Sequence, residues 1–99
     1  MKKCFAFAIG GIPDMFRHPI EFQHFMRRVT DEIKKCDGLV GLHPEETRAD
    51  SCLVFYDTLN HAKVARNKLR ALSVPCGTYI VNAEVSDDMS NAKLLEPAE

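Results

Sequence analysis

The side chains best suited to chemistry in this chain are its four histidines and four cysteines. None of the histidines stands at a metal-ligand spacing from another histidine, a cysteine or a carboxylate, and no nucleophile or phosphate-loop motif is present. The cysteines lie inside or beside apolar runs without a Cys-x-x-Cys pair, which predicts reduced, buried thiols and a cytoplasmic location. We therefore predict no metal, no cofactor and no pair of residues acting as acid and base.

The segment 10–19, GGIPDMFRHP, is where a small ligand would bind. It follows a predicted strand and precedes a helix N-terminus, whose backbone N–H groups can receive an anion. Its position resembles the ligand-binding loop of small-molecule-sensing ACT domains, although the Asp-x-Pro-Gly of that family is absent. The resemblance implies a small-molecule-sensing regulatory domain. From their place in the loop, the residues expected to line the ligand site are Gly10, Gly11, Asp14, Arg17 and His18. The alternative is a crossover loop whose apolar side chains pin it to the core.

Helix 59–72 is a second candidate binding element, because it carries four lysines and arginines and no acidic residue. Lys63, Arg66 and Arg70 fall on nearly one side, which suits phosphate groups and makes nucleic-acid binding one hypothesis. The alternative is a solvated surface whose cations favour the C-terminal end of the helix. The whole chain has a formal net charge of −1, so it presents no general polycation to nucleic acid or to a membrane.

Hydrophobic periodicity predicts six elements. Alternation indicates a strand over 3–9, and short runs of strand-forming residues indicate strands over 39–43, 52–56 and 78–85. A spacing of three to four indicates a helix that starts at Pro19 and exits at Gly38, and a second helix over 59–72. This order predicts an α+β fold, a ferredoxin-like βαββαβ sandwich in which two helices cover one face of a four-stranded antiparallel sheet. We assign 1–86 to this single domain, and 87–99 to a polar, acidic tail that either packs on the sheet or stays disordered.

The same element order occurs in the RNA-recognition motif, which stacks bases on exposed aromatic rings of its sheet. The corresponding octamer, RADSCLVF at 48–55, has Asp50 and Cys52 where the rings should stand. The sequence therefore argues against RNA binding through the sheet.

Large and small side chains alternate in KKCFAFAIGG, and this pattern assigns the two faces of the sheet. We expect Phe5, Phe7 and Ile9 beneath the helices, joined by Val40 and Leu42, by Leu53 and Phe55, and by the odd residues 79–85. The opposite face is then small and apolar, which is typical of a contact surface. The interface predicted there consists of Cys4, Ala6, Ala8, Leu39, Cys52, Val54, Tyr56 and Ile80.

The open face has three candidate occupants: a second copy of the chain, another protein, or the tail with Met89, Leu94 and Leu95. We expect the second copy, since the same face of two copies can meet about a two-fold axis. The sequence thus predicts a small, non-catalytic interaction or accessory module that self-associates through its open sheet face. On this view glutamate at Ala6 splits the dimer and leaves the fold intact.

Overall fold

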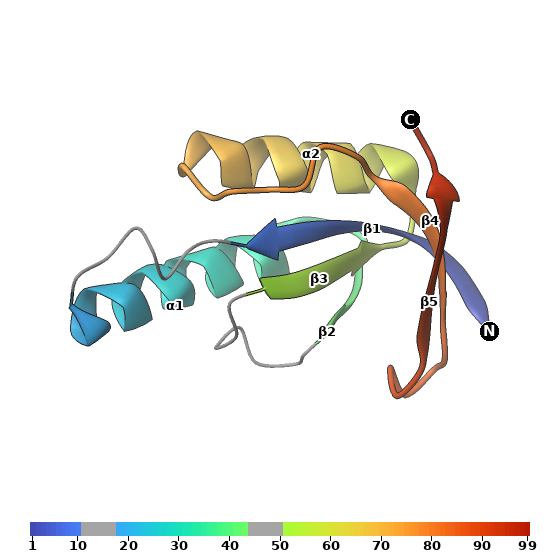
Figure 1. The fold of residues 1–99 in the computed structure, drawn as a ribbon, viewed down its shortest axis with the longest axis horizontal. Coiled ribbons are helices and arrows are strands. Elements are labelled where there is room, and N and C mark those ends of the chain that lie inside the picture. The colour runs from blue at the N-terminus through green and yellow to red at the C-terminus, as the bar shows by residue number, and fades with distance from the viewer. Residues whose placement is uncertain (11–17, 44–50) are drawn as a thin grey trace.

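The computed structural model describes residues 1–10, 18–43 and 51–99 of the chain. It contains two helices and five strands (Figure 1), in the order β1 (Lys2–Gly10), α1 (Pro19–Lys35), β2 (Leu39–His43), β3 (Ser51–Tyr56), α2 (Leu59–Ala71), β4 (Val81–Val85) and β5 (Ala92–Pro97). The strands form one antiparallel sheet with the order β2-β3-β1-β4-β5. The α+β class is confirmed.

The expected four-stranded sheet is wrong, because the tail supplies a fifth strand. β5 pairs with β4 and ends the sheet on that side. The segment AKLLEP has two adjacent leucines and no alternation, so periodicity does not mark it as a strand. Its extended conformation comes from pairing with β4. Of the helices in the described ranges, neither is both long and apolar enough to cross a bilayer.

Local signals explain both helices. Pro19 stands at the start of α1, where its missing N–H removes no helical hydrogen bond, and Lys34 and Lys35 lie in the last turn. Thr58 caps α2, and its hydroxyl accepts a hydrogen bond from the His61 backbone N–H at 3.1 Å.

The main core lies between the helices and one face of the sheet. Phe7 and Ile9 are buried there against α1 and α2, and Phe5 packs at the margin, so the predicted inward orientation of these three side chains is confirmed. The ring of Phe7 stacks on that of Tyr56 with centroids 6.1 Å apart. The Tyr56 hydroxyl donates a hydrogen bond of 3.0 Å to the backbone oxygen of Ile33 and so ties β3 to α1.

The predicted orientation of β3 is wrong. Cys52, Val54 and Tyr56 face the helices, whereas Leu53 and Phe55 point to the opposite face. The run CLVFY is apolar on both faces, so its own pattern leaves the orientation open. Pairing with β1 decides it, because directly opposed residues share a face and the register places Tyr56 opposite Phe5 and Val54 opposite Phe7.

The same correction applies to β4. Its odd residues were expected under the helices, but Val81, Ala83 and Val85 belong to the opposite face, and Ile80 lies in the main core. The register again gives the reason, since Ala83 pairs with Cys4 and Val81 pairs with Ala6.

The assignment of β2 is wrong for one residue on each face. Leu39 packs against the main core and Val40 packs on the opposite face, the reverse of the expectation, while Leu42 is in the main core as expected. A register shift between Leu39 and Gly41 interrupts the alternation. A bulge of this kind changes the face of the residues on one side of it.

Candidate functional site: the far sheet face and the β5 edge

The sheet face away from the helices, the far face, carries a second apolar cluster. Its fully buried members are Cys4, Ala6, Phe55, Ala83 and Val85, and its partly buried margin consists of Val40, Leu53, Val81 and Met89. These five side chains are buried within a single chain. The central part of the far face therefore needs no partner to exclude water.

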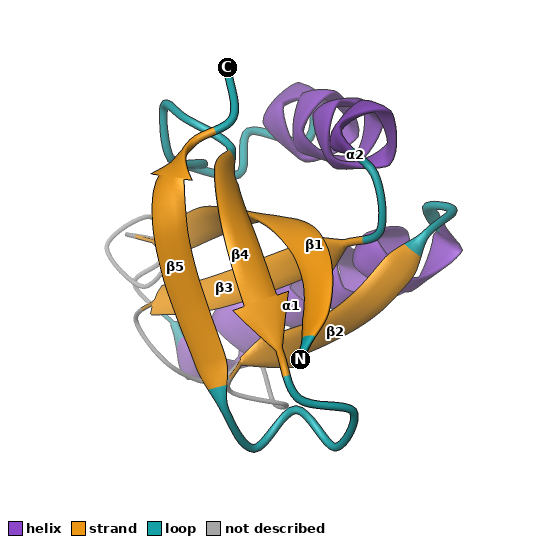
Figure 2. Ribbon diagram, turned by 90° about the vertical axis from the view of Figure 1, so that its right-hand side faces the viewer, coloured by secondary structure: helices purple, strands orange, loops and turns teal. Residues whose placement is uncertain are grey.

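The β4–β5 hairpin contributes to this closure. Figure 2 looks onto the hairpin, which crosses in front of β1 and β3 while α1 lies behind them. Met89, in its turn, reaches Gly41 of β2, where an added Cβ would stand 2.7 Å from the Met89 Cε. The turn is held by Ser86, whose hydroxyl accepts a 3.0 Å hydrogen bond from the Asn91 backbone N–H.

The residues of the predicted interface are divided between the two faces. Cys4 and Ala6 lie buried on the far face. Ala8 follows them along the same side of β1 and is exposed. The other five pack into or against the main core beneath the helices: Leu39, Cys52, Val54, Tyr56 and Ile80. The predicted surface does not exist as one patch, because β2, β3 and β4 have the opposite orientation at these positions.

Among the strand residues whose burial the structure describes, the exposed large apolar side chains lie instead on β5. All six residues of this strand are exposed, with 48% of Leu94 and 36% of Leu95 accessible. β5 forms one edge of the sheet, so one side of its backbone has no neighbouring strand in the described chain. The sequence makes Leu94 and Leu95 candidates, with Met89, to cover the open sheet face, but both leucines are exposed on β5.

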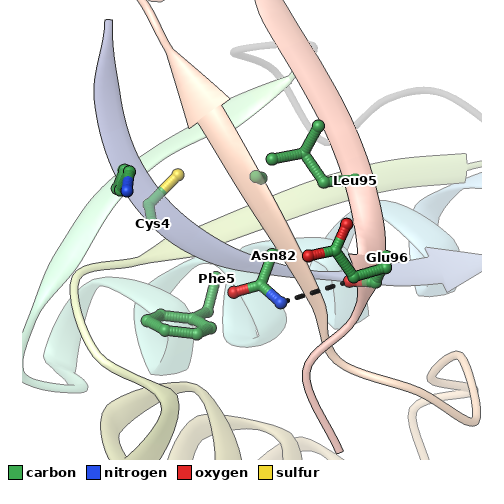
Figure 3. A pocket seen from close by; sticks show the side chains of 7 residues that line it. Cys4, Phe5, Asn82, Leu95 and Glu96 are labelled. Carbon is green, nitrogen blue, oxygen red and sulfur yellow. Dashed lines mark hydrogen bonds between the residues drawn. The ribbon is translucent and has the colours of Figure 1, made fainter.

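A hollow of about 170 Å³ lies where β1, β4 and β5 meet (Figure 3). The Asn82 amide donates a 3.3 Å hydrogen bond to the backbone oxygen of Glu96 beside it. Burial raises the pKa of the Cys4 thiol, and the charge of Lys2 offsets this only in part, which favours the protonated thiol over the thiolate. The complete lining is Lys3, Cys4, Phe5, Asn82, Ala83, Leu95 and Glu96.

The predicted ligand loop falls mostly outside the described residues, which omit Gly11, Asp14 and Arg17. Gly10 closes β1, and its N–H donates a 3.2 Å hydrogen bond to the backbone oxygen of Pro75. His18 is exposed at the N-cap of α1 without a capping side-chain bond. In the described part of the chain, no three histidine, cysteine or acidic side chains are grouped so as to hold a metal ion.

The three cations singled out on α2 have different environments. Arg70 is exposed and donates a 3.3 Å hydrogen bond to the Gly77 backbone oxygen, and Lys63 is half-buried. Arg66 is buried and paired with Glu99. The three therefore do not form one open cationic surface, because the guanidinium of Arg66 already has a carboxylate partner.

Arg66 and Glu99 form a clasp between α2 and the C-terminal segment. Nη1 and Nη2 of Arg66 donate to Oε1 and Oε2 of Glu99, the second bond being 3.1 Å long. The Ile80 backbone N–H donates a further 3.1 Å bond to Oε1. These bonds, led by those of Arg66, lower the pKa of Glu99 to about 2.

Acid is expected to weaken the fold through this clasp. Because the pKa of Glu99 falls from 4.5 in its ordinary state to about 2 in the fold, its contribution is complete above pH 4.5 and is lost as the pH falls toward 2. Urea unfolding across this range should show that the free energy of unfolding falls as the pH falls. The slope of this free energy against pH should be shallower in Glu99→Gln. An unchanged slope in that variant would contradict the assignment.

Comparison with known proteins gives no relative of this chain. No protein-family profile, no curated protein and no solved structure matches the chain. A function can therefore be inferred only from the geometry of the chain itself.

Proposed function

We propose that this protein is a small, non-catalytic interaction module that self-associates through β5. The observation that carries the proposal is the exposure of all six residues of this edge strand, including Leu94 and Leu95. An edge strand presents unpaired N–H and C=O groups that a further strand can satisfy. The proposed self-association site is thus the β5 edge of the sheet, and not the sheet face that the sequence predicts.

A second copy of the chain is the occupant that fits this edge. An antiparallel edge is complementary to itself about a two-fold axis, because each copy brings the same alternation of donors and acceptors. In the register centred on Leu94, the two Leu94 side chains stand directly opposite one another, where cross-strand apolar pairs stabilise a sheet. The formal net charge of −1 on each copy opposes such pairing only weakly.

We further infer that β1 to β4 with both helices form a ferredoxin-like unit to which β5 is added. The position of β1 between β3 and β4 supports this inference, as does the packing of both helices into one core. The four cysteines are free, and three of them are buried, which supports a cytoplasmic location.

Light scattering and sedimentation over a range of concentrations test the proposal. We expect a mass of about twice that of the monomer at tens of micromolar, and a shift to monomer in Leu94→Lys, since a charge at the centre of the paired edge must be desolvated. Val64→Lys is the matched control, because Val64 is 45% exposed on α2, away from the edge. A wild-type monomer throughout, or equal effects of both substitutions, would refute the role of β5.

A further inference from the structure

The clasp of Arg66 has the form of a receptor for a carboxylate group. Three N–H donors converge on one carboxylate: two from the guanidinium of Arg66 and one from the backbone of Ile80. The parallel N–H groups of a guanidinium match the two oxygens of a planar carboxylate. Lys63 lies three residues before Arg66 on the same side of α2 and adds a second positive charge there.

The receptor side of this contact is buried, and the ligand side is more accessible. The side chain of Arg66 is 9% exposed, compared with 24% for Glu99. Arg66 Nε, also buried, has no hydrogen-bond partner among the described residues, so the guanidinium retains unused donor capacity. A buried guanidinium without a carboxylate is costly, which means that the site favours occupation by some anion whenever Glu99 leaves.

The segment that delivers Glu99 is attached near the site through Ala98, which packs against the margin of the main core and donates a 2.8 Å hydrogen bond from its backbone N–H to the backbone oxygen of Ile80. The preceding strand β5 is paired with β4 but exposed along its length. Exposed peripheral segments of this kind open at a lower free energy than the core. Glu99 can therefore leave the site while the main core stays folded.

We propose that Arg66, the Ile80 N–H and Lys63 form a carboxylate-binding site that Glu99 occupies as an internal, competing ligand. The ligand class is a carboxylate, supplied by a small carboxylic acid or by an acidic side chain of a peptide. The effective concentration of the Glu99 carboxylate at the site is high because Glu99 is tethered beside it, so an external ligand must displace Glu99. The site is thus masked in the closed chain and becomes available when the C-terminal segment opens.

Chemical rescue of the Glu99→Ala variant tests the site. Loss of the carboxylate should lower the melting temperature by roughly 5 °C, because it leaves Arg66 unpaired. Sodium acetate, compared with sodium chloride at equal ionic strength, should restore at least half of that loss, while the wild type gains little. Should Glu99→Ala fail to fold, Glu99→Gln keeps the size of the side chain and removes its charge.

Three further arms define the ligand and exclude a general salt effect. N-acetylglutamate amide should rescue Glu99→Ala, and N-acetylglutamine amide should not. If N-acetylglutamate amide rescues the variant and acetate does not, the ligand of the site is an acidic side chain rather than a small carboxylic acid. The double variant Glu99→Ala with Arg66→Met should gain nothing from either carboxylate. Equal rescue of that double variant, equal rescue by phosphate, or no rescue of Glu99→Ala would each overturn the proposal.

Discussion

Replacing Ala6 by glutamate is expected to unfold the protein rather than to separate two folded copies. Ala6 is fully buried in β1, the central strand of the sheet, where it lies opposite Phe55 and Val81. A carboxylate placed there has no room and no partner, and an unpaired buried charge costs several kcal/mol against a total stability of about 5–15 kcal/mol. Circular dichroism should show loss of the native fold at every protein concentration.

Ala8→Glu is the matched control for this experiment. Ala8 follows Ala6 on the same side of β1, but it is exposed. Ala8→Glu should therefore retain the fold with a change of about 0.5 kcal/mol or less in its free energy of unfolding. An Ala6→Glu protein that stays folded and becomes monomeric, where the wild type is dimeric, would contradict this expectation and place a contact between copies at Ala6.

Truncating Phe55 is expected to produce the second large loss of stability. The side chain is fully buried in the far-face cluster, and Phe→Ala substitutions at such positions cost about 3–5 kcal/mol through lost burial and the cavity left behind. Because one chain completes this burial by itself, the loss measured by urea unfolding should be the same at low and high protein concentration.

Leu53→Ala tests the same face at its margin. Leu53 lies two residues before Phe55 on β3 and is only partly buried, so its truncation should cost less than that of Phe55. If the cost of Phe55→Ala rose steeply with protein concentration, burial of the far face by a second copy would have to be reinstated.

The boundaries of most elements could be predicted from local signals. Pro19 and the regular spacing of apolar residues mark α1, Thr58 marks the start of α2, and alternation marks β1. The inward orientation of Phe7 and Ile9 follows from the same alternation, because their neighbours in β1 are too small to fill a core against two helices.

The candidate sites could not be predicted in the same way. The contact between Arg66 and Glu99 joins residues far apart in the chain, and neither one differs in type from an ordinary exposed charge. The exposed edge depends on the place of β5 in the strand order. The residues of the tail carry no periodic signal for that place.

The sequence by itself determined the α+β class, the two helices and the inner face of β1, because each depends on periodicity and on caps within one segment. Only the tertiary structure decided the orientation of β3 and β4, the fifth strand and the partner of Arg66. A strand that is apolar on both faces takes its orientation from the register with its neighbours, and a charge takes its partner from the packing of distant segments. Neither is encoded in the pattern of a single element.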